Sequence, residues 1–139
     1  MKLVVDTNVL VSAFLWQGTL GRLIELAADK EIELFTSRTL LDELAATLAK
    51  KKLAKPVLAT RLTADQMLRN YRRLATRVTA RQLAQQISRD ADDDAVLACA
   101  LAASADLIVS GDDDLLVLKH FQRIPIATPA QALRVIGGT

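Results

Sequence analysis

The sequence predicts an α/β protein, a three-layer sandwich in which helices flank a central, mainly parallel, twisted sheet. Short apolar segments typical of buried strands alternate with longer segments whose apolar residues recur at helical spacing. This alternation is typical of a parallel sheet covered by helices. The chain has 139 residues, of which 51% are hydrophobic, and this suits one core. We therefore expect a single domain over residues 1–139.

The strands and helices are expected at alternating positions along the chain. Strands are expected at residues 2–6, 32–36, 77–79, 106–110 and 124–127, and helices at 9–16, 20–30, 37–52, 57–77, 94–103 and from 129 onward. Ser37 and Thr128 are the expected N-caps of two of these helices. Thr63 and Gln66 have the spacing of a capping box, which would start a separate helix within 57–77.

The cysteine content and the lengths of the apolar runs indicate where the protein works. Cys99 is the single cysteine, so neither a disulfide framework nor a cysteine-rich metal site is expected. The longest apolar runs are well short of the ~20 residues that cross a bilayer. We therefore expect a cytoplasmic protein without a membrane partner.

Basic residues are concentrated between residues 50 and 89, where eleven Lys and Arg side chains accompany one acid, Asp65. An uneven distribution of this kind indicates a polyanionic partner beside an acidic centre. The alternative is that these side chains only solvate two amphipathic helices. The candidates for binding a nucleic-acid backbone are Lys50, Lys51, Lys52, Arg69, Arg72 and Arg73.

Two acidic positions follow expected strands. Asp6 ends the apolar run Leu-Val-Val, and Asp112 follows Ser110 and Gly111 at the end of another strand. Since ligands collect beyond the carboxyl ends of parallel strands, both acids are expected at the same rim of the sheet. Taken alone, Asp6 is better explained as a cap of the next helix than as a ligand.

Two further acidic positions lie on expected helices. Glu43 borders the apolar stripe of its helix, from where it could reach the sheet rim, although Glu43 taken alone is better explained as a solvated residue at the flank of the helix. Asp93 and Asp94 begin a helix that is apolar almost all round, so periodicity does not decide which of them faces inward. Acids in a first helical turn also complement the helix dipole.

Four acidic positions at the ends of buried elements together favour a shared divalent cation. Oxygen ligands without clusters of His or Cys suit Mg²⁺ or Mn²⁺. The sequence contains neither a phosphate-binding P-loop nor the GxSxG motif of serine hydrolases. Acids that hold such a cation can catalyse hydrolysis of a phosphodiester.

Four segments resemble, in order and spacing, those of the PIN-domain ribonucleases, particularly the small bacterial toxins of type II toxin-antitoxin pairs. They are VVDTNVLVSA, LLDELAATL, RDADDDAVLACALA and DLIVSGDDDLL, and the resemblance that they carry extends over nearly the whole chain. The resemblance implies a parallel sheet flanked by helices, a Mg²⁺ or Mn²⁺ site and endonucleolytic cleavage of RNA.

The resemblance also implies roles for particular residues. Asp6 is the first acid of the site, and Asn8 supports it by hydrogen bonding. Glu43 is the second acid. The third is the acid that opens a D-x-x-L-A-x-A helix, which is Asp94 here, with Asp93 in a supporting position.

The fourth acid is Asp112, two residues after the strand-end hydroxyl of Ser110, with Asp114 as a helper or substitute. The resemblance further implies a cognate antitoxin and a homodimer. Apolar residues of the first two helices could line the dimer interface, although core burial explains them equally well; they are Leu10, Phe14, Leu15 and Trp16.

The sequence therefore predicts a divalent-metal-dependent endoribonuclease in which Asp6, Glu43, Asp94 and Asp112 hold the cation. The alternative is a catalytically silent module on the same fold that binds RNA or a protein.

Overall fold

A six-stranded sheet is the centre of the computed structural model, which describes residues 1–16, 18–83, 85–87 and 91–137. The strands are β1 (Lys2–Val5), β2 (Glu33–Thr36), β3 (Ala75–Arg77), β4 (Leu107–Val109), β5 (His120–Phe121) and β6 (Ile124–Ala127). Across the sheet their order is β3-β2-β1-β4-β6-β5. All neighbouring strands are parallel except β5 and β6, which are antiparallel.

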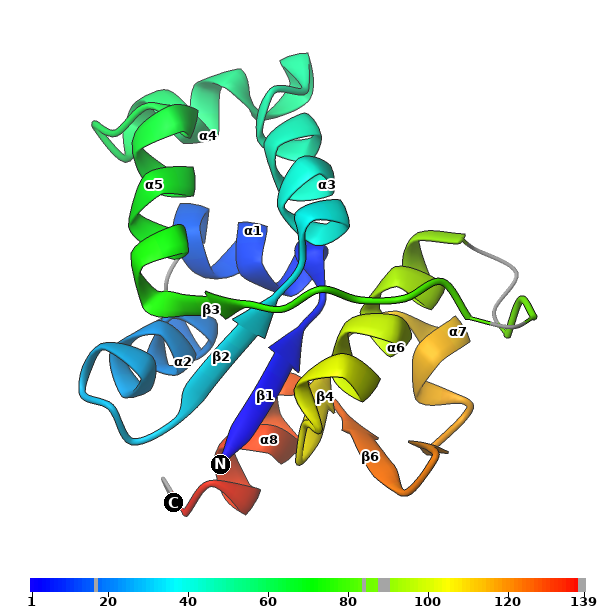
Figure 1. The fold of residues 1–139 in the computed structure, drawn as a ribbon. Coiled ribbons are helices and arrows are strands. Elements are labelled where there is room, and N and C mark those ends of the chain that lie inside the picture. The colour runs from blue at the N-terminus through cyan, green and yellow to red at the C-terminus, as the bar shows by residue number, and fades with distance from the viewer. Residues whose placement is uncertain (17, 84, 88–90, 138–139) are drawn as a thin grey trace.

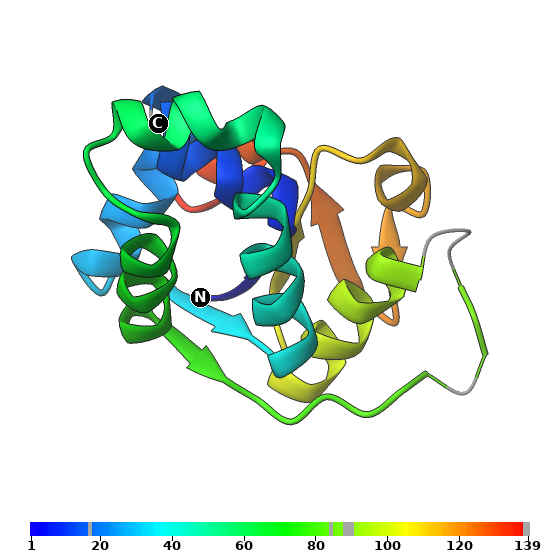
Figure 2. The ribbon, with the colours of Figure 1, turned by 90° about the horizontal axis from the view of Figure 1, so that it is seen from above.

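Helices cover both faces of this sheet (Figures 1 and 2). They are α1 (Thr7–Trp16), α2 (Gly18–Ala28), α3 (Arg38–Leu48), α4 (Ala54–Ala59), α5 (Ala64–Leu74), α6 (Ala91–Ala103), α7 (Asp113–Leu116) and α8 (Pro129–Val135), with a 3-10 turn, η1, at Lys51–Leu53. The predicted three-layer α/β sandwich with a mainly parallel sheet is confirmed.

The core consists of two apolar clusters, one on each face of the sheet. Leu3 and Val5 of β1 pack into the cluster formed with α1, α2, α3, α5 and α8. Val4 between them packs into the other cluster, formed mainly with α6 and the segment around α7. Side chains alternate between the faces of a strand, so a strand buried on both sides needs a continuous apolar run. This explains the sequence Leu-Val-Val.

Side-chain caps fix the starts of three helices. The Ser37 hydroxyl accepts a hydrogen bond from the backbone N–H of Leu40 at the start of α3. Thr63 and Thr128 each form a complete capping box, at the starts of α5 and α8. All three helix starts agree with the sequence prediction.

Other boundaries differ from the prediction. The expected helix 57–77 is instead α4, α5 and β3, and α3 ends at Leu48 before the η1 turn. Pro56 is inside α4 because it occupies the first turn, where its missing N–H has no intrahelical partner to lose. The short elements α7 and β5 were not expected.

No single helix in the described parts of the chain is long and apolar enough to cross a membrane. Only α1 and the Leu20–Ala28 part of α2 reach that length and composition when joined, and they are bent by 90° relative to each other.

The strand order places the ends of β1 and β4 together at the centre of the sheet. From β1 the chain moves outward through β2 to β3, whereas from β4 it moves to β6 on the opposite side. Ligands of parallel sheets bind at such a switch point, beyond the carboxyl ends of the strands. The backbone N–H of Asp6 donates to the Val109 carbonyl at 2.9 Å, so the two strand ends are joined directly.

Candidate metal site

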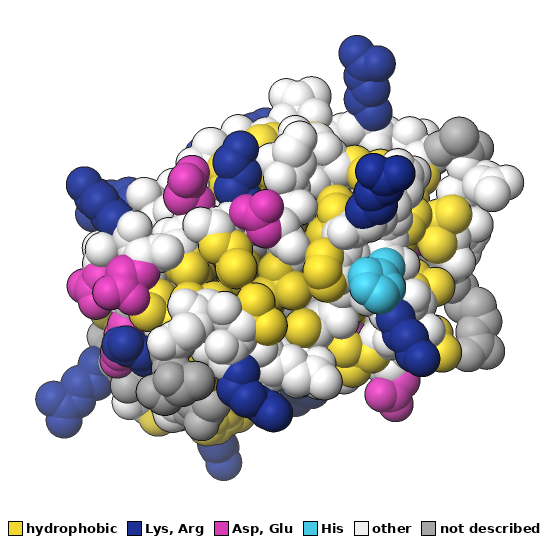
Figure 3. All heavy atoms as spheres, turned by 90° about the horizontal axis from the view of Figure 1, so that it is seen from below, with side chains coloured by type: hydrophobic (Ala, Val, Ile, Leu, Met, Phe, Trp, Pro, Cys, Tyr) yellow, Lys and Arg dark blue, Asp and Glu magenta, His cyan; other side chains and the backbone are white. Residues whose placement is uncertain are grey.

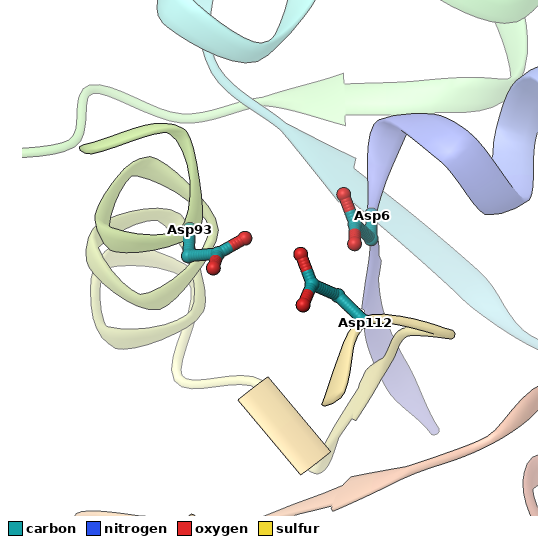
Figure 4. Close-up of side chains that lie close together, drawn as sticks. All are labelled: Asp6, Asp93 and Asp112. Atoms are coloured by element: carbon teal, nitrogen blue, oxygen red, sulfur yellow. The ribbon is translucent and has the colours of Figure 1, made fainter. Parts of the chain in front are cut away.

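Three aspartates meet at this switch point. Among the described residues, Asp6, Asp93 and Asp112 each offer a carboxylate oxygen, and these oxygens all lie within 4.8 Å of one another (Figure 4). Asp6 follows β1, Asp112 follows β4, and Asp93 belongs to the first turn of α6. Three different elements of the fold thus converge on one point.

Asp6 is held by both its backbone and its side chain. Its backbone N–H donates to the Val109 carbonyl of β4. Its backbone carbonyl accepts a hydrogen bond of 3.1 Å from the N–H of Leu10, at the start of α1. The Ser110 hydroxyl donates to Asp6 Oδ2 at 2.8 Å. With only 6% of the residue exposed, the carboxylate has little freedom to move. The sequence left open whether Asp6 is a helix cap or a site residue, and its position serves both.

Ser110 connects two of the three acids. It is fully buried, and while its hydroxyl donates to Asp6 it also accepts the backbone N–H of Asp112 at 2.9 Å. Asp112 Oδ1 in turn accepts the Asp114 N–H at 2.9 Å and caps α7. The turn that carries Asp112 is therefore fixed relative to Asp6. The carboxyl group of Asp114, the predicted helper, is not part of the group of three described above.

The structure corrects the choice of inward-facing acid on α6. Asp93 is 3% exposed and belongs to the group of three, whereas Asp94 is half-buried and its Oδ2 accepts the Ile87 N–H at 2.9 Å. Successive helical residues point about 100° apart, and here it is the Asp93 carboxylate that joins the group at the strand ends. The prediction that Asp94 faces inward in preference to Asp93 is wrong.

Glu43 lies on α3 and is half-buried, with its Oε2 atom buried. Its carboxylate is not among the three that lie within 4.8 Å of one another in the described part of the chain. The structure thus brings together three acids, and the role of Glu43 as a fourth ligand stays a prediction.

Burial raises the pKa of the Asp6 carboxyl above its ordinary value of 3.8. The negative charge of Asp112 acts in the same direction, while hydrogen bonds from Ser110 and from the backbone N–H groups of Thr7 and Asn8 oppose the shift. A buried carboxylate beside like charges is costly unless a cation neutralises it. Three carboxylates are a suitable donor set for Mg²⁺ or Mn²⁺, which prefer oxygen ligands.

The other predicted residues lie on the surface. Asn8 is in the first turn of α1 and is exposed. The six predicted RNA-binding side chains, at or next to η1 and on α5, are also exposed: Lys50, Lys51, Lys52, Arg69, Arg72 and Arg73.

On the face at the opposite end of the strands from the aspartates, Lys and Arg are interspersed with Asp and Glu around an apolar band (Figure 3).

The fold and the site define an α/β protein with a three-aspartate group at the carboxyl edge of a parallel sheet. The family model of the PIN domain matches residues 2–114. The chain therefore belongs to the PIN-domain family, and the resemblance seen in the sequence is confirmed.

A chain from a solved structure shares the fold. The crystal structure is that of VapBC2 from Rickettsia felis bound to a DNA fragment from their promoter. The match has a TM-score of 0.62 and 16% sequence identity, and it covers 92% of this chain and 98% of that chain. No curated protein matches the sequence.

The raised pKa of Asp6 predicts how the metal-free protein responds to pH. A carboxyl whose pKa is higher in the folded state contributes most to stability below its unfolded value, and that contribution is lost as pH rises through the folded pKa. We expect Asp6→Asn to increase the free energy of unfolding of the metal-free protein at pH 7, measured by urea denaturation in EDTA. The gain should shrink as pH falls toward 4.

Asp42→Asn is the control, because Asp42 is exposed on α3. It should leave the unfolding free energy within about 0.5 kcal/mol of the wild type. Equal destabilisation by Asp6→Asn at both pH values would contradict the electrostatic explanation.

Proposed function

We propose that this protein is a divalent-metal-dependent endoribonuclease that hydrolyses RNA phosphodiester bonds in the cytoplasm, and that it is the toxin of a toxin-antitoxin pair. The observation that supports catalysis most directly is the convergence of Asp6, Asp93 and Asp112 within 4.8 Å. Membership of the PIN-domain family and the basic stretch of the chain favour the same conclusion.

The three aspartates would hold Mg²⁺ or Mn²⁺. When bound, such a cation neutralises charge on the phosphate and makes a water molecule easier to deprotonate. Asp6 and Asp112 keep their relative position through Ser110, and Asp93 closes the group from α6. Ligands fixed in this way lose little conformational freedom on binding a cation. Glu43 is the proposed fourth carboxylate, on the strength of the family resemblance.

The hydrolysis forms a bond between the oxygen of water and phosphorus, breaks one P–O ester bond and leaves a proton on the departing oxygen. The RNA strand is the proposed substrate because exposed Lys and Arg side chains of η1 and α5 can neutralise its phosphates. The competing function is a silent module that binds RNA without cutting it.

An antitoxin is the proposed partner, since the structural match is to a complex described as VapBC2. An apolar groove of about 560 Å³ between α1, α2 and α5 is a suitable surface for such a partner, and Phe14, Leu62 and Met67 are among its lining residues. A homodimer is also proposed from the family resemblance. Of the four residues predicted for its interface, Leu10 is buried in the core, whereas Trp16 is 60% exposed.

The neighbouring aspartates of α6 provide a matched test of catalysis. With Mn²⁺ and a mixture of structured and single-stranded RNAs, Asp93→Asn should reduce the rate of cleavage by about 10²-fold or more, because it removes one of the carboxylates that would hold the cation at the reacting phosphate. Asp94→Asn should reduce it far less. Gel or sequencing assays of the cleaved RNA measure both rates.

EDTA should abolish cleavage by the wild type, and added Mn²⁺ should restore it. Purified protein that binds these RNAs but cuts none of them with Mg²⁺ or Mn²⁺ would refute the proposed activity and favour the silent module.

The basic residues of α5 should control affinity and its salt dependence. The triple variant Arg69→Ala/Arg72→Ala/Arg73→Ala is expected to weaken RNA binding and to reduce the slope of log affinity against log salt by about 0.7 for each phosphate that is no longer neutralised. Fluorescence anisotropy at several salt concentrations measures this slope. An unchanged slope would mean that these side chains only solvate the helix.

The toxin proposal predicts growth arrest when this chain is produced alone. Co-production with the protein encoded by the neighbouring reading frame should restore growth, and Leu62→Glu, which places a charge at the edge of the apolar groove, should weaken that rescue. Normal growth with an enzyme that is active in vitro would rule out the toxin role while leaving the nuclease activity in place.

A further inference from the structure

A second feature adjoins the three aspartates: a cleft of about 300 Å³ between the start of α1 and the turn after β4. Asp112 belongs both to the acid group and to the lining of this cleft. Asn8, two residues after Asp6, lies on the same rim. Whatever occupies the cleft would therefore lie against Asp112, one of the residues that would hold the cation in the proposed reaction.

We propose that this cleft is a nucleoside subsite, which takes the base and sugar of one nucleotide next to the scissile phosphate. The inference rests on the proposed nuclease function and deepens it by naming where the substrate is recognised. It assigns selectivity for the RNA sequence to this cleft and not to the basic residues of η1 and α5, whose proposed role is to neutralise phosphates.

The size of the cleft favours a single nucleoside. Binding pockets for small ligands have volumes of about 300–1,000 Å³, and this one is at the lower limit. It cannot enclose two stacked nucleotides, so the remainder of the strand would cross the surface. Specific contact with one nucleotide is what a cleavage site preference requires.

The chemistry of the lining also matches a nucleoside. Asn8 and Ser12 are one helical turn apart on α1, so their side chains project to the same side. An amide and a hydroxyl offer both donors and acceptors to the edge of a base or to a ribose hydroxyl. Leu20 and Pro129 add apolar surface for the face of the base. A purely apolar ligand would leave Asn8 and Ser12 without hydrogen-bond partners, and a purely acidic ligand would make no use of the apolar surface of Leu20 and Pro129.

Gly111 provides a way to block the cleft without straining the backbone. It lines the cleft, and a Cβ placed on it would meet no atom within 4 Å. Its φ is outside the left-handed region that favours glycine. A larger side chain at this position should therefore meet no obstacle at its Cβ, leave the turn between β4 and Asp112 in place and narrow the cleft that Gly111 lines.

The test uses nucleoside 5′-monophosphates as probes, because they contain no phosphodiester bond and stay intact. In the presence of Mg²⁺, NMR titration of the wild-type protein with each of the four should shift the amide signals of Asn8, Ser12 and Gly111. Gly111→Val should weaken the binding at least about tenfold, by overfilling the space. Ala130→Val, an exposed substitution next to Pro129 but outside the cleft, should bind as the wild type does.

Calorimetric titration with Mn²⁺ separates blockage of the cleft from damage to the acid group. Gly111→Val should bind Mn²⁺ with unchanged affinity. If Gly111→Val also loses Mn²⁺ binding, a second variant decides. Ser12→Leu fills the cleft from α1 and leaves the turn untouched, and its binding of nucleotides and of Mn²⁺ is measured in the same two ways.

The subsite would be overturned if the variant that retains Mn²⁺ bound nucleotides as well as the wild type does. It would also be overturned if the nucleotides shifted amide signals only on other parts of the surface. The result is independent of cleavage: a protein that binds nucleotides here and cuts no RNA would refute the proposed nuclease and keep the subsite.

Discussion

The rest of the structure depends on the placement of three carboxyl groups within 4.8 Å of one another at the end of a buried sheet. Such an arrangement opposes folding, because burial and neighbouring charge both raise the pKa of Asp6. The apolar clusters on the two faces of the sheet supply the stabilisation that makes it tolerable. Strands β1 and β4 are buried among them, so the chain cannot separate its acids without exposing its core.

The fixed position of the acids has a local cause as well. Ser110 donates to one carboxylate and accepts from the backbone that carries another, so a single hydroxyl sets the spacing between Asp6 and the Asp112 turn. Replacement of this serine by an apolar residue would leave the buried Asp6 carboxylate and the part-buried Asp112 N–H without their bonds, and loss of the buried partner alone costs about 1–3 kcal/mol. The hydroxyl thus serves folding and the site together.

Much of this arrangement could be predicted from the sequence, because strand ends and caps leave local signals. The run Leu-Val-Val before Asp6 and the segment before Ser110 are short, continuous and apolar, as strands buried on both faces must be. The inward position of Asp93 could not be predicted, since α6 is apolar almost all round and has no polar face that would show which side of the helix is turned outward.

Helix α7 and strand β5, with four and two residues, are too short to show any periodicity. The start of α5 within residues 57–77 could be predicted from the capping box at Thr63. Strand β3 could not, because it forms by pairing with β2, which is distant in sequence.

The acids of the group come from positions 6, 93 and 112, and β4, the strand before the last of them, pairs with β6 near the end of the chain. During synthesis, the first acid leaves the ribosome long before the third has been translated. The cluster is absent from every nascent chain that ends before residue 112, and β4 gains its outer neighbour only once Ile124–Ala127 has emerged. The order of the elements along the gene therefore delays assembly of the charged centre until the scaffold that restrains it is almost complete.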